Sequence, residues 1–113
     1  MRFQYDPSKA ASNLKKHGVS FADAEGVFFD PLAIHQLDPD SEDEERFIAV
    51  GMGSAGIILV VVYTLRGDEI RLISARHATR HEVKNYERLI RLFEGQAWRT
   101  NSGKSQNTHH YLY

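Results

Sequence analysis

The chain has 113 residues, of which 42% are hydrophobic and 26% are charged, a size that suits one globular domain with a single core. It has no cysteine, which excludes a disulfide framework, a thiol nucleophile and a cysteine-ligated metal. The net charge of −1 combines an acidic segment at 38–45 with a basic second half, so it favours no class of partner.

The start of the chain predicts a short strand followed by two helices. RFQY alternates like a strand, and Asp6 stands where an N-cap residue precedes a proline at the first helical position. Gly18 predicts a left-handed C-terminal cap with a Schellman contact between Leu14 and Val19. Ser20 is then placed to cap a second helix, which the following Asp-Pro pair ends.

Four strands are predicted next, and short turns join the last three, so we expect an antiparallel meander. The third is apolar at almost every position, which predicts a central strand covered on both faces by helices. GMGSAG joins two strands and opens no helix, which argues against a dinucleotide-binding or kinase phosphate loop. The predicted strands are LAIHQL (32–37), RFIAVG from 46, GIILVVVYTL from 56 and EIRLISAR from 69.

A last helix begins at TRHE, a capping box in which Thr79 is the N-cap and Glu82 is the third helical residue. Polar, aperiodic sequence follows Gly95. We therefore expect one α+β domain over residues 1–94 and a flexible tail over 95–113. The apolar run GIILVVVYTL is about half as long as a membrane-spanning helix, and no signal peptide is apparent, so we expect a soluble cytoplasmic protein.

Basic side chains gather at the start of that helix: Arg76, His77, Arg80 and His81 lie within six positions. A helix N-terminus disfavours cations unless an anion lies there, so the cluster predicts a bound phosphate. The alternative is that Arg76 and His77 are a solvated strand end and that Arg80 pairs with Glu45 or another acid of the 38–45 run.

Three stretches together resemble the BrnT toxin family: YDPSKAASNLKKHGVSFADAEGVFFDP, EERFIAVG and ILVVVYTLRGDEIRLISARHATRHEVKNY. The resemblance implies a RelE-like fold, with an antiparallel four-stranded sheet plus the short first strand, packed by two N-terminal helices and one C-terminal helix. It implies an endoribonuclease that inhibits translation and growth with no metal or cofactor. It also implies a BrnA antitoxin whose ribbon-helix-helix domain binds promoter DNA, in a heterotetramer around a toxin dimer. His77 and His81 stand where the family more often has Arg or Lys.

Cleavage of RNA by its own 2′-hydroxyl requires a base, an acid and a cation that stabilises the phosphorane. We expect Arg76 to stabilise the phosphorane, Arg80 with the helix start to hold the phosphate, and His77 or His17 to move protons. The remaining candidates are Glu45 as an acid or base, and Lys15, Lys16, Arg46, Thr79 and His81 as contacts to RNA.

Several of these candidates also have a structural explanation. The Lys15–His17 cluster suits the dipole at a helix C-terminus, Glu45 can be a solvated loop acid, and Glu82 is explained by the capping box. The acidic run lacks the glycine of a calcium loop, and His35, His109 and His110 lack zinc-site spacing. We expect this run to attract a basic segment of the antitoxin.

Two other functions remain open from the sequence. One is a module that binds RNA or the ribosome without cleaving RNA, and the other is a decayed toxin that binds only its antitoxin.

Overall fold

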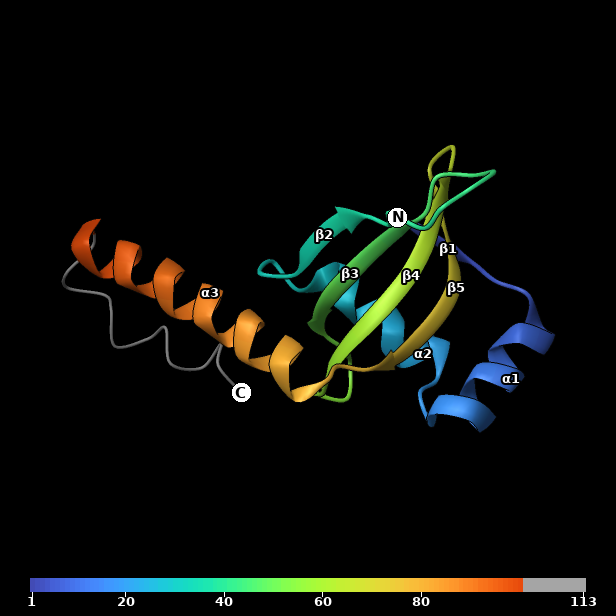
Figure 1. Ribbon diagram of the computed structural model, residues 1–113, viewed down its shortest axis with the longest axis horizontal. Helices are drawn as coiled ribbons and strands as arrows, with labels where there is room; N and C mark the ends of the chain where they lie inside the picture. Colours follow the sequence, from blue (N-terminus) through green and yellow to red (C-terminus); the bar gives the residue numbers. More distant parts are fainter. Residues whose placement is uncertain (101–113) are drawn as a thin grey trace. The chain divides into compact units, whose positions relative to one another are not determined.

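The structure, a computed structural model, describes the backbone of residues 1–100 and the side chains of residues 1–93. The chain divides into two compact units, Met1–Ala78 and a second that begins at Thr79. The elements, labelled in Figure 1, are β1 (Arg2–Gln4), α1 (Pro7–His17), α2 (Phe21–Glu25), the 3₁₀ helix η1 (Gly26–Phe29), β2 (Ile34–Leu37), β3 (Phe47–Met52), β4 (Ile58–Arg66), β5 (Glu69–His77) and α3 (Arg80–Thr100).

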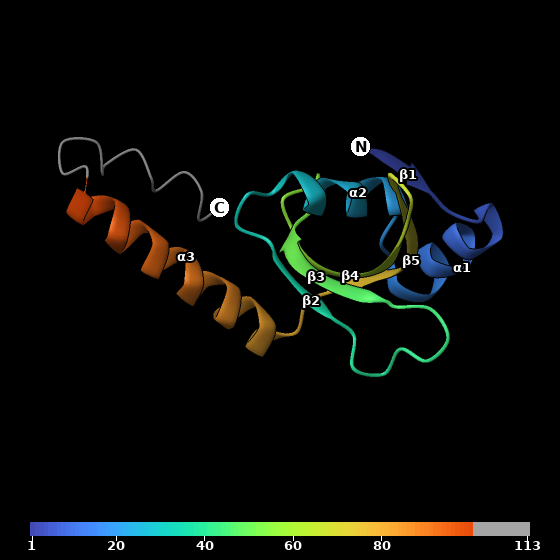
Figure 2. The same ribbon diagram turned by 90° about the horizontal axis from the view of Figure 1, so that it is seen from above.

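The first unit is built on a five-stranded sheet in the order β1-β5-β4-β3-β2. Strands β2 to β5 pair antiparallel, which confirms the predicted meander, while β1 pairs in parallel with β5 and makes the sheet mixed. Seen from above, α2 lies in the concave side of the curved sheet, and the loop between β2 and β3 lies on the opposite side (Figure 2).

The core forms between the concave face of the sheet and the helices α2 and η1. Phe21, Ala24 and Val27 of these helices are buried in one cluster with Val61 and Leu72 of the sheet. β4 is buried on both faces, as its apolar sequence predicts. The expectation that helices cover both faces is not met within Met1–Ala78, where α2 and η1 occupy the concave face and the β2–β3 loop lies on the other.

A β-bulge in β5 changes the direction in which its last residues point. Val62 pairs with Ser74 and Tyr63 with Leu72, so Ile73 is the extra residue of the bulge. Strict alternation would put Arg76 on the same face as Leu72. Because of the bulge, Ala75 joins the buried core instead and Arg76 turns to the convex face.

The helix caps follow the sequence prediction closely. Asp6 and Ser20 cap α1 and α2, each accepting a backbone N–H with its side-chain oxygen. Gly18 is left-handed at φ 69°, and its N–H donates to the Leu14 carbonyl at 2.8 Å. That bond is the single bond of the αL motif. Leu14, the predicted apolar partner of Val19 at this cap, is 52% exposed, whereas Val19 is buried.

The helix α3 begins with the predicted capping box. The Thr79 N–H donates to Glu82 Oε1 at 2.7 Å, and the Glu82 N–H donates to Thr79 Oγ1 at 3.2 Å. The helix continues through Gly95 to Thr100, so the expected domain boundary at residue 94 falls inside it. One helical glycine costs only about 1 kcal/mol, which neighbouring helix-forming residues can offset. The rest of the expected tail, 101–113, lies outside the described residues.

Candidate functional site

An asparagine fastens the end of α1 to the last part of β5. β1 pairs with β5 only as far as Arg71, so the edge of β5 beyond that residue needs other partners. Asn13 supplies them: its Oδ1 accepts the Ala75 N–H at 3.1 Å, and its Nδ2 donates to the Ala75 carbonyl at 2.8 Å and to the Val19 carbonyl at 3.0 Å. The buried Asn13 amide therefore continues the sheet edge in place of a strand.

Asn13 also shows which face of α1 is turned inward. Residues 10, 13 and 17 share one face at helical spacing, and Ala10 and His17 are half-buried while Asn13 is buried. The other apolar residues in this part of α1, Ala11 and Leu14, are exposed. His17 lies one turn beyond the clamped Asn13, on the inward face.

A small cavity of about 40 Å³ lies where the end of α1 meets the end of β5. Its walls come from three stretches of the sequence: residues 18–23 at the α1 cap and the start of α2, residues 53–59 of the β3–β4 turn and the start of β4, and His77 at the end of β5. His77 and Gly18 both line it, and Gly18 directly follows His17. The lining residues are Gly18, Val19, Asp23, Gly53, Ala55, Ile57, Leu59 and His77.

The β3–β4 turn approaches α2 very closely at this cavity. The Ser54 N–H donates to the Asp23 carbonyl at 3.1 Å, and a side chain at Gly26 would collide with the Ser54 backbone nitrogen. A glycine at position 26 is therefore required for this contact. Gly53 and Gly56 of GMGSAG lie in the turn between β3 and β4, as predicted, whereas Gly51 is still part of β3, and the turn forms one wall of the cavity.

Basic side chains lie in the two segments that meet at this cavity, although Arg76, on the convex face of β5, does not line it. Lys15 and Lys16 are exposed in the last turn of α1, and His17 is half-buried. His77 is exposed at the end of β5, and Arg76 donates from Nη1 to the His77 carbonyl at 3.1 Å. The structure thus brings two of the predicted site histidines, His17 at the end of α1 and His77 at the end of β5, to the same end of the sheet.

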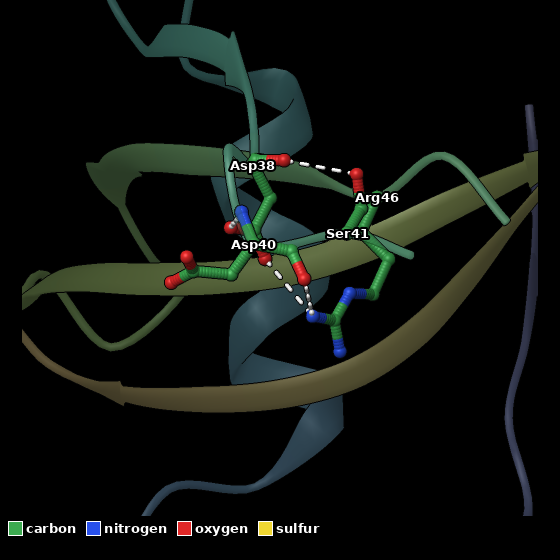
Figure 3. Close-up of polar contacts among 4 residues, drawn as sticks. All are labelled: Asp38, Asp40, Ser41 and Arg46. Carbon is green, nitrogen blue, oxygen red and sulfur yellow. Dashed lines mark hydrogen bonds and ion pairs between the residues drawn. The ribbon is translucent and has the colours of Figure 1, made fainter. Parts of the chain in front are cut away.

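Glu45 and Arg46 lie at the opposite end of the sheet. Phe47, which follows them, pairs with Tyr63, whereas His77 pairs with Leu59, four residues away along β4 or roughly 13 Å. Arg46 Nη2 lies 3.4 Å from Asp38 Oδ2 and donates to the Asp40 carbonyl at 3.3 Å (Figure 3). The two residues are therefore not part of the cluster around His77.

The start of α3 already contains an anion. The Glu82 carboxylate accepts the Thr79 N–H, so it occupies part of the positive helix end. Arg80 and His81 are exposed in the first turn. This explains much of the cationic first turn without a phosphate, and it leaves the side chains of Arg80 and His81 as the groups that can contact RNA.

A histidine and a tyrosine with shifted pKa values lie away from the predicted site. His35 Nδ1 and the Tyr63 hydroxyl share a hydrogen bond of 2.8 Å, with Phe28 packed against both rings. Burial lowers the pKa of His35, although the nearby Asp30 carboxylate raises it, and burial raises the pKa of Tyr63. This pair joins the edge strand β2, where His35 is largely exposed, to β4, and Phe28 packs against both rings, so its role is structural.

Within residues 1–93, no group of three His, Asp or Glu side chains is arranged to hold a metal ion. No helix of the described chain is long and apolar enough to cross a bilayer. Sequence reasoning missed Asn13 and the bulge at Ile73. The signal for Asn13 is that it is a polar residue on the same helix face as Ala10. No local sequence pattern indicates the bulge.

Comparison with known proteins gives a consistent result. Residues 5–82 match the family described as the ribonuclease toxin, BrnT, of type II toxin–antitoxin systems. The crystal structure of the Brucella abortus ribonuclease toxin BrnT is similar, with 29% sequence identity and a TM-score of 0.54, over 71% of this chain and 99% of that one. No curated protein matches the sequence significantly. The family match covers well over half of the chain, and the chain therefore belongs to the BrnT family of ribonuclease toxins.

Proposed function

We propose that this toxin is a metal-independent endoribonuclease that cuts single-stranded RNA by in-line attack of the 2′-hydroxyl, and so inhibits growth. The observation that carries the proposal is the convergence of the α1 end and the β5 end on one cavity, whose lining includes His77 and the residue after His17. Both segments carry the residue types that such cleavage requires.

The chemistry divides among these residues as follows. The nucleophile is part of the RNA, so the protein must remove its proton, protonate the leaving 5′-oxygen and stabilise the phosphorane. His77 and His17 are the proposed acid–base pair, because a neutral imidazole accepts a proton and an imidazolium donates one near neutral pH. Arg76, at the end of β5, is the proposed cation that stabilises the phosphorane.

The remaining basic groups are proposed to bind the flanking RNA. Lys15 and Lys16 extend the positive surface from the α1 end, and as exposed cations they suit phosphate contacts. Arg80 and His81 follow directly in the chain and are proposed to bind a neighbouring phosphate through their side chains. Thr79 is assigned to the capping box, and Glu45 and Arg46 are left out of the proposed site because they lie at the other end of the sheet.

The decisive experiment is incubation of antitoxin-free protein with end-labelled RNA in excess EDTA. The wild type is compared with Arg76→Ala and with Arg71→Ala, a matched change on the same strand near its other end. We expect wild-type fragments that end in 2′,3′-cyclic phosphate, a loss of two or more orders of magnitude in Arg76→Ala, and a change of less than threefold in Arg71→Ala.

Other outcomes would point to the remaining functions. Intact RNA with retained RNA affinity would indicate a binding module, and absence of both activities would indicate a decayed toxin. Cleavage by Arg76→Ala within a few-fold of the wild type would refute the assignment of Arg76. Cleavage that stops in EDTA and returns with a divalent cation would refute metal independence.

The proposal extends to the partner and the assembly. Type II toxins are neutralised by a protein antitoxin, and we propose a BrnA-type ribbon-helix-helix protein that binds promoter DNA. A toxin dimer within a heterotetramer, a RelE-like relationship of the fold and a cytoplasmic location belong to the same proposal. Light scattering of the purified complex tests the assembly directly.

A further inference from the structure

The loop between β2 and β3 covers a hollow on the convex side of the sheet. The hollow has a volume of about 310 Å³ and lies entirely within the first unit. Four acidic side chains and one arginine form its outer wall, and two residues of β4 and β5 form its floor. The lining residues are Asp40, Glu42, Asp43, Glu44, Arg46, Thr64 and Ile73.

The floor of this hollow contains a buried hydroxyl that has no partner. Thr64 is 1% exposed, and its Oγ1 makes no hydrogen bond in the structure. A buried hydroxyl normally has a partner, because leaving it unsatisfied costs on the order of 1–3 kcal/mol. Thr64 lines the hollow, so a ligand that enters it and displaces the atoms covering this hydroxyl can supply the missing hydrogen bond.

The wall carries more negative charge than its own cations balance. Arg66 binds Glu44 through Nε and Nη2, both at 3.3 Å, and Arg46 binds Asp38. Among the described residues, no ion pair joins the carboxylates of Asp40, Glu42 or Asp43 to a basic side chain. The hollow therefore favours a cationic ligand and repels the phosphates of RNA.

Arg46 indicates which kind of cation fits the hollow. Its guanidinium approaches the Asp38 carboxylate at 3.4 Å and the Asp40 carbonyl at 3.3 Å, so the loop already holds one organic cation by charge and hydrogen bonds (Figure 3). A metal ion fits less well, because no three carboxylates of the described residues converge on one point. An ammonium or guanidinium group carries several N–H donors that spread over separated acceptors.

We propose that this hollow is the docking site for a lysine or arginine side chain of the antitoxin. The cationic head group lies between the carboxylates of Asp40, Glu42 and Asp43 and donates to Thr64 Oγ1. The docking site is separate from the basic end of the sheet around His77, so antitoxin contact here anchors the complex and does not itself fill the cleavage site. The inference rests on the antitoxin partnership stated in the proposed function.

The test measures the affinity of the separately purified antitoxin for toxin variants by calorimetry. Thr64→Val removes the hydroxyl and keeps the shape, and because the hydroxyl has no partner, the free toxin should be at least as stable as the wild type. We expect about tenfold weaker binding, which corresponds to one hydrogen bond to a charged group. Glu42→Gln with Asp43→Asn should weaken binding by a similar factor and reduce its salt dependence.

Glu25→Gln, which removes a carboxylate on α2, is the matched control and should bind the antitoxin normally. Unchanged affinity of both Thr64→Val and the Glu42/Asp43 variant would overturn the proposal. If these variants instead abolish self-association of the toxin alone in sedimentation, the hollow binds a second copy and the proposal is also wrong. RNA cleavage, measured on the same variants, should be unaffected, which separates this inference from the proposed activity.

A second measurement needs no antitoxin. Ethylammonium chloride, titrated into the toxin alone, should shift the amide NMR signals of Thr64 and Ile73, whereas sodium chloride at equal ionic strength should not. The shift should disappear in Thr64→Val. Equal shifts with both salts would show that the hollow has no preference for an organic cation and would overturn the proposal.

Discussion

Replacing Asn13 by alanine removes three hydrogen bonds that join α1 to the edge of β5. The bonds are at 2.8, 3.0 and 3.1 Å, and they satisfy the Ala75 N–H, the Ala75 carbonyl and the Val19 carbonyl. With about 1 kcal/mol for each net bond, Asn13→Ala should lower the free energy of unfolding by about 3 kcal/mol. For a domain of this size that corresponds to a fall in Tm of roughly 12–24 °C.

Urea denaturation followed by circular dichroism measures the loss, and Ser12→Ala is the control, because Ser12 is the exposed neighbour on the same helix. The control should change stability by less than about 0.5 kcal/mol. Hydrogen exchange gives a local test: the Ala75 amide should exchange faster in Asn13→Ala, since its acceptor is gone. A loss below about 1 kcal/mol, with Ala75 exchange unchanged, would show that the amide is not the clamp described here.

Asn13→Asp distinguishes hydrogen bonding from packing at the same position. Aspartate keeps the shape and the acceptor for the Ala75 N–H but replaces the donor to two carbonyls with an oxygen. It should therefore destabilise at least as much as alanine near neutral pH. If aspartate were tolerated and alanine were not, volume would matter more than the hydrogen bonds, and the reasoning would be refuted.

Three further predictions concern acidity and glycine. Because burial lowers the pKa of His35, the folded state binds its proton less tightly than the unfolded state. The free energy of unfolding should therefore be constant above about pH 6.5 and decrease as the pH drops below that value. In urea melts at pH 5–8, His35→Gln should weaken this pH dependence. Gly18→Ala should cost about 1 kcal/mol, because φ is 69° and no atom crowds the position, and an unchanged midpoint would argue against the left-handed cap. Gly26→Ala should cost about 1–3 kcal/mol through the collision with the Ser54 nitrogen; a stability equal to wild type would mean that the turn moves freely.

Much of the fold follows from local patterns in the sequence. The meander was predictable because its strands are apolar and its turns are short, and the caps at Asp6, Ser20 and Thr79 were predictable because each satisfies backbone donors within a few residues. The basic cluster at the start of α3 could also be recognised from the sequence. The Glu82 carboxylate occupies part of the positive helix end, as the predicted capping box implies, and the contact of Arg80 with a phosphate stays a prediction.

The candidate site was less predictable, because its residues come from distant segments. Glu45 and Arg46 are predicted as site residues together with the basic cluster, yet strand pairing places them at the far end of the sheet. The 62-residue separation between Asn13 and Ala75 leaves no local signal of their contact. The sequence around Thr64 is typical of a strand, and only the fold places the β2–β3 loop beside this residue.

The sequence by itself indicated the order and approximate bounds of the helices and strands of the first unit, because caps, turns and apolar periodicity act over a few residues. It also carried the family resemblance. It did not predict that the second helix changes from α to 3₁₀ at Gly26. Only the tertiary structure decided which way the functional residues point. The bulge at Ile73 reverses the alternation of β5 and turns Arg76 away from the core, and the Asn13 amide brings the α1 end to Ala75. Both depend on pairing between distant segments, where the backbone of one satisfies the hydrogen bonds of the other.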